Sequence, residues 1–573
     1  MIFLKENGAK IKEDFNALRK KYPSLLREAE EQLGTLEPDT ALALQFLYIA
    51  MPLSDMANYR FDLFLEYALH GVWLWEHSEA VRELPEGIYL EYVLLHRVNG
   101  EEIRPCRRQF AAELWDRVAE KNAHDAAIET NFWCAEHVTY QSTDDRTLSA
   151  AATYERGYGR CGEESVFCVN ALRSVGIPAR QVYAPKWGHC DDNHAWVEVW
   201  CEGEWYYLGA CEPEMRLNRG WFREASSRAM MVHSRSFWLP ADNTVMNMEG
   251  IVSMRNQLPR YASAQEICVL ALESDGTPAA GVTVTFGLLN YAEYAPVATV
   301  RTGEDGRAQF WTGFGSLYVQ VAASDGRYKG SLMDTRSVTM ISVKLPEKTA
   351  LQPPDEWEDI DFFAPLEMPP QALSAELTLR ERNMGRERLN QANQLRTSRT
   401  ESWENSERVF FLSKERDQKW REKLLSVLTE KDQTDLKADI LEEHLNYALP
   451  YADVTEEDLF VHYILNPRVS DEILACWRKE ILAFFDDKKD CFQHDPVRIW
   501  RWITEHIESR PEREHNQVIT LPAACLKGGI GSTASKKILF VAIARTFGVP
   551  ARLNPCDAEP EYWDGERFVT VSE

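Results

Sequence analysis

Gly157-Tyr-Gly-Arg-Cys161-Gly-Glu-Glu-Ser165 opens the stretch that decides the fold, and Asn193-His-Ala-Trp-Val-Glu-Val-Trp200 continues it. The residues between them form an apolar run with helical spacing that ends at Gly176-Ile-Pro-Ala-Arg180. Because Cys161 follows a glycine-rich turn and precedes this run, we predict that it opens a helix. A cysteine at the start of a helix is suited to nucleophilic chemistry when a basic partner lies close to it.

After His194 the spacing of apolar residues changes from the helical period to a period of two. Ala195, Val197 and Val199 point to one side of the predicted strand, and the residues between them point to the other. Glu202-Gly203 then predicts a hairpin turn into a second strand over 204–208. A helix followed by antiparallel strands predicts an α+β domain.

Cys161 and His194 together form a candidate catalytic pair. Helix N-terminal amides and a neighbouring imidazolium lower the pKa of a thiol, so we predict a lowered pKa for Cys161. His194 would then act as the base that activates the thiol and as the acid that protonates the leaving amine. We interpret Cys168 and Cys201, inside the predicted helix and strand, as packing residues.

The same motifs resemble the transglutaminase-like superfamily in their order and spacing. The resemblance rests on Gly-Arg-Cys-Gly-Glu-Glu-Ser, Gly-Ile-Pro-Ala-Arg, Asn-His-Ala-Trp-Val-Glu-Val-Trp and the following Trp-Tyr-Tyr strand, and it covers residues 132–221. It implies a papain-like α+β core with a Cys-His-Asp triad. In that core Cys161 is the nucleophile and His194 is its partner.

The third member of the implied triad departs from the family pattern. The family aspartate position, four residues after the tryptophan of the second strand, is occupied by Gly209. The nearest acid is Glu212, which precedes a proline as the family aspartate often does, so we assign Glu212 as the third catalytic residue. Glu214, Asp191 and Asp192 remain alternatives for this role. A backbone amide at the cysteine supplies one oxyanion donor, while Gln141 or a nearby indole is a candidate for the second.

The second half of the chain repeats motifs of the first half. Arg97 and Arg107 have counterparts 371 residues later at Arg468 and Arg478. The stretch 157–161 corresponds to Gly529-Ile-Gly-Ser-Thr533, so threonine stands in place of the cysteine. No histidine follows it, and the chain stops at residue 573, which predicts a degenerate copy that is truncated or has an incomplete sheet.

The remaining segments complete a multidomain α+β prediction. Short β-rich runs near 267–272, 282–286, 308–311, 317–321 and 338–343 alternate with turn signals and predict an immunoglobulin-like β-sandwich. An acidic, proline-rich stretch follows and predicts a linker. The expected domains are an N-terminal helical subdomain (1–125), a transglutaminase-like core (126–262), the sandwich (263–346), the linker (347–371), a second helical region (372–495) and a degenerate transglutaminase-like domain (496–573).

Composition narrows the classes of partner and cofactor. The net charge of −26 repels polyanions, so we expect no nucleic acid partner and no membrane surface. The 12 cysteines form no CxxC pair, and no calcium-loop signature is present, so no metal or other cofactor is expected. The N-terminus lacks the apolar core of a secretory signal, which favours a cytoplasmic location.

These observations favour a thiol enzyme that acts on a peptide or protein substrate. We expect cleavage or transfer of an amide bond through a cysteine acyl-enzyme intermediate, most simply by a peptidase or amidase. One alternative is a non-catalytic scaffold for peptide or glycan binding, because the family aspartate is missing and the 18 tryptophans offer stacking surfaces. The other alternative is an acyltransferase that cross-links proteins.

Overall fold

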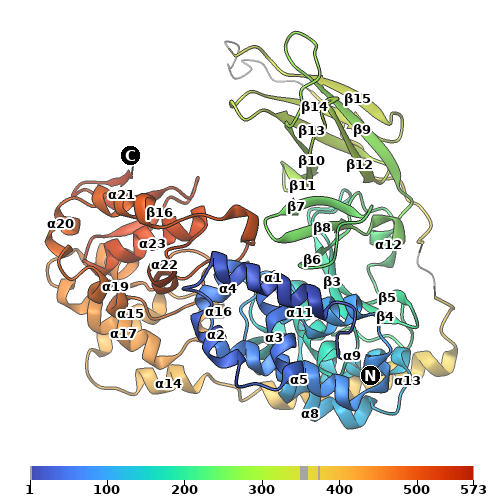
Figure 1. The fold of residues 1–573 in the computed structure, drawn as a ribbon, viewed down its shortest axis with the longest axis horizontal. Coiled ribbons are helices and arrows are strands. Elements are labelled where there is room, and N and C mark those ends of the chain that lie inside the picture. Colours follow the sequence, from blue (N-terminus) through green and yellow to red (C-terminus); the bar gives the residue numbers. More distant parts are fainter. Residues whose placement is uncertain (1–2, 349–358, 372–373, 572–573) are drawn as a thin grey trace.

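The computed structural model describes residues 3–348, 359–371 and 374–571, so part of the predicted linker, 349–358, lies outside the described residues. The chain is a multidomain α+β protein with helical regions and several sheets (Figure 1). Within the described ranges, no helix combines the length and the apolar character that crossing a membrane requires.

The N-terminal helices share one apolar core. Phe46, Phe64 and Leu90 are fully buried in it. Pro52 and Pro85 stand directly before two of the helices, where the missing N–H of proline costs no helical hydrogen bond. The elements are α1 (Gly8–Lys21), α2 (Arg27–Leu33), α3 (Pro38–Ala50), α4 (Leu53–Asn58), α5 (Phe61–His77), α6 (Glu79–Arg82), α7 (Glu86–Tyr89) and the π-helix η1 (Leu90–Leu94).

Helix α11 (Cys161–Ser174) is the central helix of the next core. Every residue from Glu163 to Ser174 is buried. Its neighbours are α8 (Arg107–Val118), α9 (Ala123–His137) and α10 (Ala150–Arg156), while β3 and β4 of a sheet also pack against it. Two short parallel strands, β1 (Thr139–Tyr140) and β2 (Tyr158–Gly159), lie beside its N-terminus.

The sheet of this core is antiparallel and has six strands in the order β5-β4-β3-β6-β8-β7. Val197 and Val199 face the α11 core, whereas Trp196 joins the apolar cluster on the other face, as the alternation predicted. The predicted hairpin is present, and Glu202 and Gly203 at its turn both have positive φ. The elements are β3 (Ala179–Ala184), β4 (His194–Cys201), β5 (Glu204–Leu208), α12 (Arg223–Ser226), β6 (His233–Ser236), β7 (Val245–Glu249), β8 (Val252–Asn256) and the 3-10 helix η2 (Leu258–Arg260).

A two-sheet β-sandwich follows and stands above the core in Figure 1. One sheet has the order β11-β10-β13-β14, the other has the order β12-β9-β15, and both contribute to one apolar cluster. Strands β11 and β14 are additional to the runs that the sequence indicated. The elements are β9 (Gln265–Leu272), β10 (Thr283–Asn290), β11 (Glu293–Arg301), β12 (Arg307–Thr312), β13 (Ser316–Ala322), β14 (Tyr328–Asp334) and β15 (Met340–Lys344).

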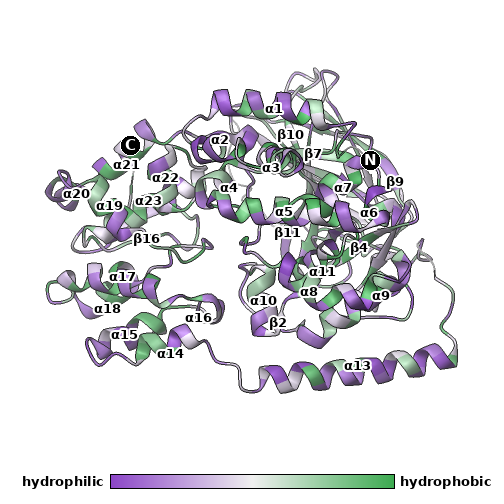
Figure 2. Ribbon diagram, turned by 60° about the horizontal axis from the view of Figure 1, so that its bottom comes forward, coloured by the Kyte–Doolittle hydropathy of each residue, from purple (hydrophilic) through white to green (hydrophobic). Residues whose placement is uncertain are grey.

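The long helix α13 (Leu379–Thr400) runs along α9 of the first core and leads to the second half of the chain (Figure 2). Hydrophilic residues cover much of its length, and polar contacts such as the ion pair of Arg388 with Glu129 join it to the core. The helices that follow are α14 (Ser406–Leu412), α15 (Gln418–Ser426), α16 (Glu430–Asp435), α17 (Ala438–Ala448), η3 (Leu449–Tyr451), α18 (Glu457–Phe460), the π-helix η4 (Val461–Leu465), α19 (Arg478–Phe484), α20 (Lys489–His494), α21 (Val497–His506), η5 (Pro511–Arg513), α22 (Pro522–Gly528) and α23 (Thr533–Thr546). A three-stranded antiparallel sheet, formed by β16 (Ala551–Leu553), β17 (Pro560–Trp563) and β18 (Phe568–Thr570), completes the described chain.

The two halves repeat individual contacts as well as motifs. Each half has a π-helix, η1 or η4, followed by an arginine that binds a buried aspartate. Arg97 binds Asp55 of α4, and Arg468 binds Asp432 of α16. The helices α11 and α23 both contain 14 residues and begin at Cys161 and at its counterpart Thr533. These matched contacts support the internal repeat that the motifs predicted.

Candidate active site

Cys161 is the first residue of α11, and two glycines shape the turn that leads to it. Gly157 ends α10 with a φ of 87°, a left-handed conformation that glycine adopts readily. At Gly159 a Cβ atom would lie 2.5 Å from Cβ of Glu163, so a larger residue does not fit there. Glu163 accepts a hydrogen bond of 2.8 Å from the backbone N–H of Arg160, which caps the helix. Local contacts therefore place Cys161 at the predicted helix start.

The N-terminus of α11 meets the beginning of β4, where His194 stands. His194 is the first residue of β4 and pairs with Ala184 of β3. The backbone amide of Ala195, the residue after His194, acts to lower the pKa of the Cys161 thiol, and α11 packs against β4. Cys161 is partly exposed, whereas Cys168 is buried. The tertiary structure thus brings the predicted nucleophile against the residue that follows the predicted base.

The His194 imidazole lies in an aromatic enclosure. Its ring centroid is 4.6 Å from that of Trp221, 5.0 Å from that of Phe222 and 5.9 Å from that of Trp196. Only 9% of the residue is exposed. Its Nε2 atom is buried and has no hydrogen-bond partner among the residues that the structure describes.

Burial determines the charge of both groups. Desolvation lowers the pKa of His194 from 6.5 to about 4. Desolvation also raises the pKa of Cys161 above its ordinary value, although the Ala195 amide and Arg160 act in the opposite direction. The prediction of a lowered Cys161 pKa is therefore wrong, because the cost of burying a thiolate exceeds the effect of the nearby donors. Both shifts favour the uncharged forms, a thiol at Cys161 and a neutral imidazole at His194.

Glu212, the predicted third member, is linked to His194 through another side chain. Its carboxylate accepts a hydrogen bond of 2.9 Å from the indole Nε1 of Trp221, whose ring packs on His194. A tight turn brings Glu212 back to Gly209, with its backbone N–H 3.2 Å from the Gly209 carbonyl oxygen. Burial raises the pKa of Glu212, and the indole hydrogen bond opposes that rise.

A second carboxyl group, Glu164, lies one helical turn after Cys161. It is buried, and its Oε1 atom has no hydrogen-bond partner within the described part of the chain. Burial, followed by the charges of Glu212 and Glu163, raises the pKa of Glu164 well above its usual range. Glu164 also adds to the rise in the pKa of Cys161. A protonated Glu164 is thus the form that this environment favours.

The alternative candidates have other contacts. Asp191 accepts a hydrogen bond of 2.6 Å from the backbone N–H of Tyr291 in the sandwich. Asp192 accepts one of 2.8 Å from the backbone N–H of the next residue. The backbone N–H of Gln141 donates to the carbonyl of Gly159 at 2.8 Å, so its side chain amide alone is free to act as an oxyanion donor.

A cavity of about 340 Å³ lies between the Glu212 turn and α13. Glu212, Glu214 and Trp221 line one side, and residues of α13, among them Asn393 and Arg396, line the other. Arg396 is held by the carbonyl of residue 135 at 2.8 Å. The long helix of the second half therefore forms one wall of a space that borders the candidate site.

The β-sandwich also contacts the site, through the loop that precedes His194. Asn290, at the end of β10, donates hydrogen bonds to the carbonyls of Trp187 at 3.2 Å and Cys190 at 2.9 Å. Asn290 is only 1% exposed. These contacts join the sandwich to the loop that leads into β4.

Sequence reasoning did not assign Trp221, Glu164 or Asn290 to the site. Glu164 belongs to the motif that carries Cys161, and Trp221 ends the segment of resemblance, so their positions gave a partial signal. Asn290 gave none, because the loop that it holds lies about 100 residues earlier in the chain.

Comparison with known proteins identifies one related segment. Residues 108–210, which include Cys161 and His194 and end just before Glu212, match the family model described as the transglutaminase-like superfamily. No curated protein matches the chain. A solved structure from Cytophaga hutchinsonii, described as a "putative cysteine protease", is 17% identical with a TM-score of 0.20, and the match covers 32% of this chain and 66% of that chain. The segment that carries both predicted catalytic residues is thus similar to the transglutaminase-like superfamily.

Proposed function

We propose that this protein is a transglutaminase-like thiol enzyme that cleaves or transfers an amide bond, with peptidase or amidase activity as the simplest form. The observation that carries the proposal is the contact of α11, which begins at Cys161, with β4, which begins at His194, where the Ala195 backbone amide acts to lower the pKa of the thiol. Cys161 is partly exposed at this contact, which leaves it open to a substrate carbonyl.

The chemistry begins from neutral groups. As the Cys161 sulfur attacks the substrate carbonyl carbon, the thiol proton passes to His194. The backbone N–H of Cys161, in the first helical turn, has no intrahelical acceptor and is suited to bind the developing oxyanion. The imidazolium then protonates the leaving amine as the C–N bond breaks, which leaves a thioester on Cys161. Water, deprotonated by His194, hydrolyses the thioester and restores the thiol.

The burial of His194 opposes this sequence, because an imidazolium must form in an aromatic enclosure. Glu212 is the acid best placed to stabilise that charge. It now binds the Trp221 indole, and a movement of that ring would open a path from Glu212 to the imidazole. We assign Glu212 the orienting role on this basis, with Trp221 as the side chain that must move.

The test compares the wild type with Cys161→Ala on a library of N-terminally blocked peptides, with and without a small primary amine. Mass spectrometry should detect cleaved products that carry one added water, and these should disappear in Cys161→Ala and in His194→Gln. Cys190→Ala, at an exposed cysteine, is the matched control and should retain activity. Amine adducts in place of hydrolysis products would indicate acyl transfer. Equal turnover by Cys161→Ala would refute the thiol mechanism.

The binding scaffold remains the second candidate because the resting pair is uncharged and His194 Nε2 lacks a hydrogen-bond partner in the described structure. Such a scaffold would retain peptides from the same library with equal affinity in the wild type and in Cys161→Ala, and it would release no product. Binding without turnover in both proteins would favour this candidate.

A further inference from the structure

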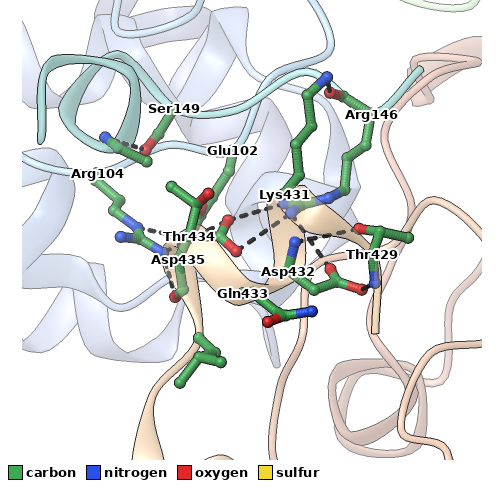
Figure 3. A network of polar contacts seen from close by, with 12 residues as sticks. Glu102, Arg104, Arg146, Ser149, Thr429, Lys431, Asp432, Gln433, Thr434 and Asp435 are labelled. Carbon is green, nitrogen blue, oxygen red and sulfur yellow. Dashed lines mark hydrogen bonds and ion pairs between the residues drawn. The ribbon is translucent and has the colours of Figure 1, made fainter. Parts of the chain in front are cut away.

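Helix α16 of the second half docks on the first core through its charged side chains (Figure 3). Glu430 at its start binds Arg156 at 2.6 Å and also accepts a hydrogen bond from the Tyr158 hydroxyl. Asp435 at its end binds Arg146 at 2.9 Å. The helix is only six residues long, so these contacts, rather than an apolar face, determine where it sits.

Lys431 is the cationic residue of this helix, and it is buried. Its side chain is 3% exposed, and its ammonium group donates to the carbonyl oxygens of Asp144 and Arg146, both at 2.5 Å. The third donor goes to the carboxylate of Glu163 at 2.8 Å. All three donors of the ammonium group are therefore used, which is what a buried lysine requires.

Glu163 is the residue that caps the helix of Cys161. Its side chain is fully buried and contacts two cations, Lys431 and Arg160. The negative charge of Glu163 contributes to the raised pKa of Cys161, and Arg160 acts against it. Lys431 thus ties the first turn of α11, which begins at Cys161, to the loop over 144–146, whose Asp145 binds Arg160.

The loop is held from a second direction as well. Arg146 binds Asp432 at 3.3 Å in addition to Asp435, and Asp432 is the aspartate of the repeated arginine contact. Figure 3 shows these groups gathered around α16, with Arg104 and Glu102 at one end of the network. The loop over 144–146 is therefore anchored on residues that lie almost 300 positions later in the chain.

The internal repeat provides a natural comparison. The counterpart of Lys431 is Ser54, which precedes Asp55 as Lys431 precedes Asp432. Ser54 accepts a hydrogen bond of 3.0 Å from the Thr520 hydroxyl, and the backbone N–H of Thr520 donates to Ser535 of α23 at 2.9 Å. Ser54 also donates to the buried carboxylate of Glu514 at 2.8 Å, so hydroxyls and one carboxylate connect the halves beside Thr533, whereas a lysine–carboxylate ion pair connects them beside Cys161.

We propose that Lys431 is a positioning residue of the Cys161 site, so that the second half of the chain completes the active site of the first. The proposal rests on the proposed function. It explains why a buried lysine lies on the side of the cysteine and a serine lies at the equivalent place on the side of the threonine: the lysine offsets a capping carboxylate next to a group that must become a thiolate.

The test measures alkylation of Cys161 by iodoacetamide as a function of pH, with the Cys161 peptide quantified by mass spectrometry. Lys431→Met leaves Glu163 with one cation, so the midpoint should rise by about 0.5–1 pH unit, which slows alkylation at pH 8 by about three- to tenfold. Glu163→Gln removes the opposing charge, so its midpoint should fall below that of the wild type. The double variant should lie between the two.

Ser54→Ala is the matched control, because it breaks the equivalent contact in the other half, and its midpoint should equal that of the wild type. Circular dichroism and thermal unfolding establish that each variant is folded. An unchanged midpoint in both Lys431→Met and Glu163→Gln, or an equal rise in both, would overturn the proposal. If Lys431→Met does not fold, the double variant decides the question: its midpoint should lie above that of Glu163→Gln, and an equal midpoint would overturn the proposal.

This measurement needs no turnover of substrate. If the wild type cleaves no peptide, but the midpoint rises in Lys431→Met and falls in Glu163→Gln, the proposed function is refuted. The role of Lys431 in setting the state of Cys161 is then retained. If the wild type cleaves peptides, but neither variant shifts the midpoint, the proposed function is retained and the role of Lys431 is refuted.

Discussion

Replacing Trp221 with alanine should release His194 from part of its burial. The indole lies 4.6 Å from the imidazole and is itself 62% exposed, so its removal admits water to one side of the ring. Burial lowers the pKa of His194 from 6.5 to about 4. Phe222 and Trp196 remain in place, so we expect the pKa of His194 to rise by roughly 1, equivalent to about 1.4 kcal/mol.

The same substitution frees Glu212 from its hydrogen bond with the indole. A freed carboxylate that reaches the imidazole would favour the imidazolium and raise the pKa of His194 further. Trp221→Ala combined with Glu212→Gln separates the two effects: the part that depends on water survives in the double variant, and the part that depends on the carboxylate does not.

The assay is a titration of histidine side chains by nuclear magnetic resonance in protein labelled with nitrogen-15 at histidine. His194→Gln assigns the signal of His194. Trp311→Ala is a suitable control because this tryptophan is 46% exposed on the sandwich. An unchanged titration midpoint in Trp221→Ala would show that the indole does not cause the shift, and the proposed gating role of Trp221 would fail with it.

Three further predictions concern stability and the loop before β4. Burial lowers the pKa of His70 to about 4, so as pH falls from 7 to 5 the unfolded chain gains a proton that the folded chain does not. Over this range the free energy of unfolding, measured with urea, should therefore fall by about 2 kcal/mol more in the wild type than in His70→Gln. Arg180→Met should lower the free energy of unfolding by about 3–5 kcal/mol, because it removes a partner 2.8 Å from the fully buried Glu198. Arg552→Met, at the more exposed repeated position, should lower it by about 1 kcal/mol or less. Asn290→Ala should free the loop before β4 and lower turnover at Cys161 by about tenfold with little effect on the fold, as measured by peptide cleavage and circular dichroism.

Each of these has a clear contrary result. An equal loss of stability on acidification in wild type and in His70→Gln would contradict the burial argument. Equal costs at the two arginine positions would show that exposure does not control the strength of the ion pair. Unchanged turnover after the asparagine substitution would leave the sandwich as a spacer only.

The local elements of the site were readable in the chain itself. Glycine before Cys161, helical spacing after it and alternation after His194 are short-range patterns, and α11, β4 and the hairpin to β5 follow them. The same holds for the repeat, because the matched arginines and glycines occupy equivalent backbone positions in both halves. The helix, strand and hairpin depend on residues close together in the chain, whereas the repeated arginine–aspartate contacts, 42 and 36 residues apart, follow from the shared fold of the two halves.

The chemistry of the site depended on distant contacts. The direction of the Cys161 pKa could not be inferred from its place at a helix start, because burial by the surrounding core outweighs the nearby donors. Glu212 could be named as the nearest acid, but only the folded chain placed the Trp221 indole between it and the imidazole.

By itself, the sequence determined which residues begin the helix and the strand of the candidate site, and that the second copy has Thr533 where the first has Cys161. The tertiary structure alone decided the surroundings of these residues: a sandwich asparagine on the loop before His194 and a lysine of the second half on the cap of α11. The physical reason is that helix and turn preferences act over a few residues. Desolvation and charge compensation depend on which segments, often far apart in the chain, are packed together.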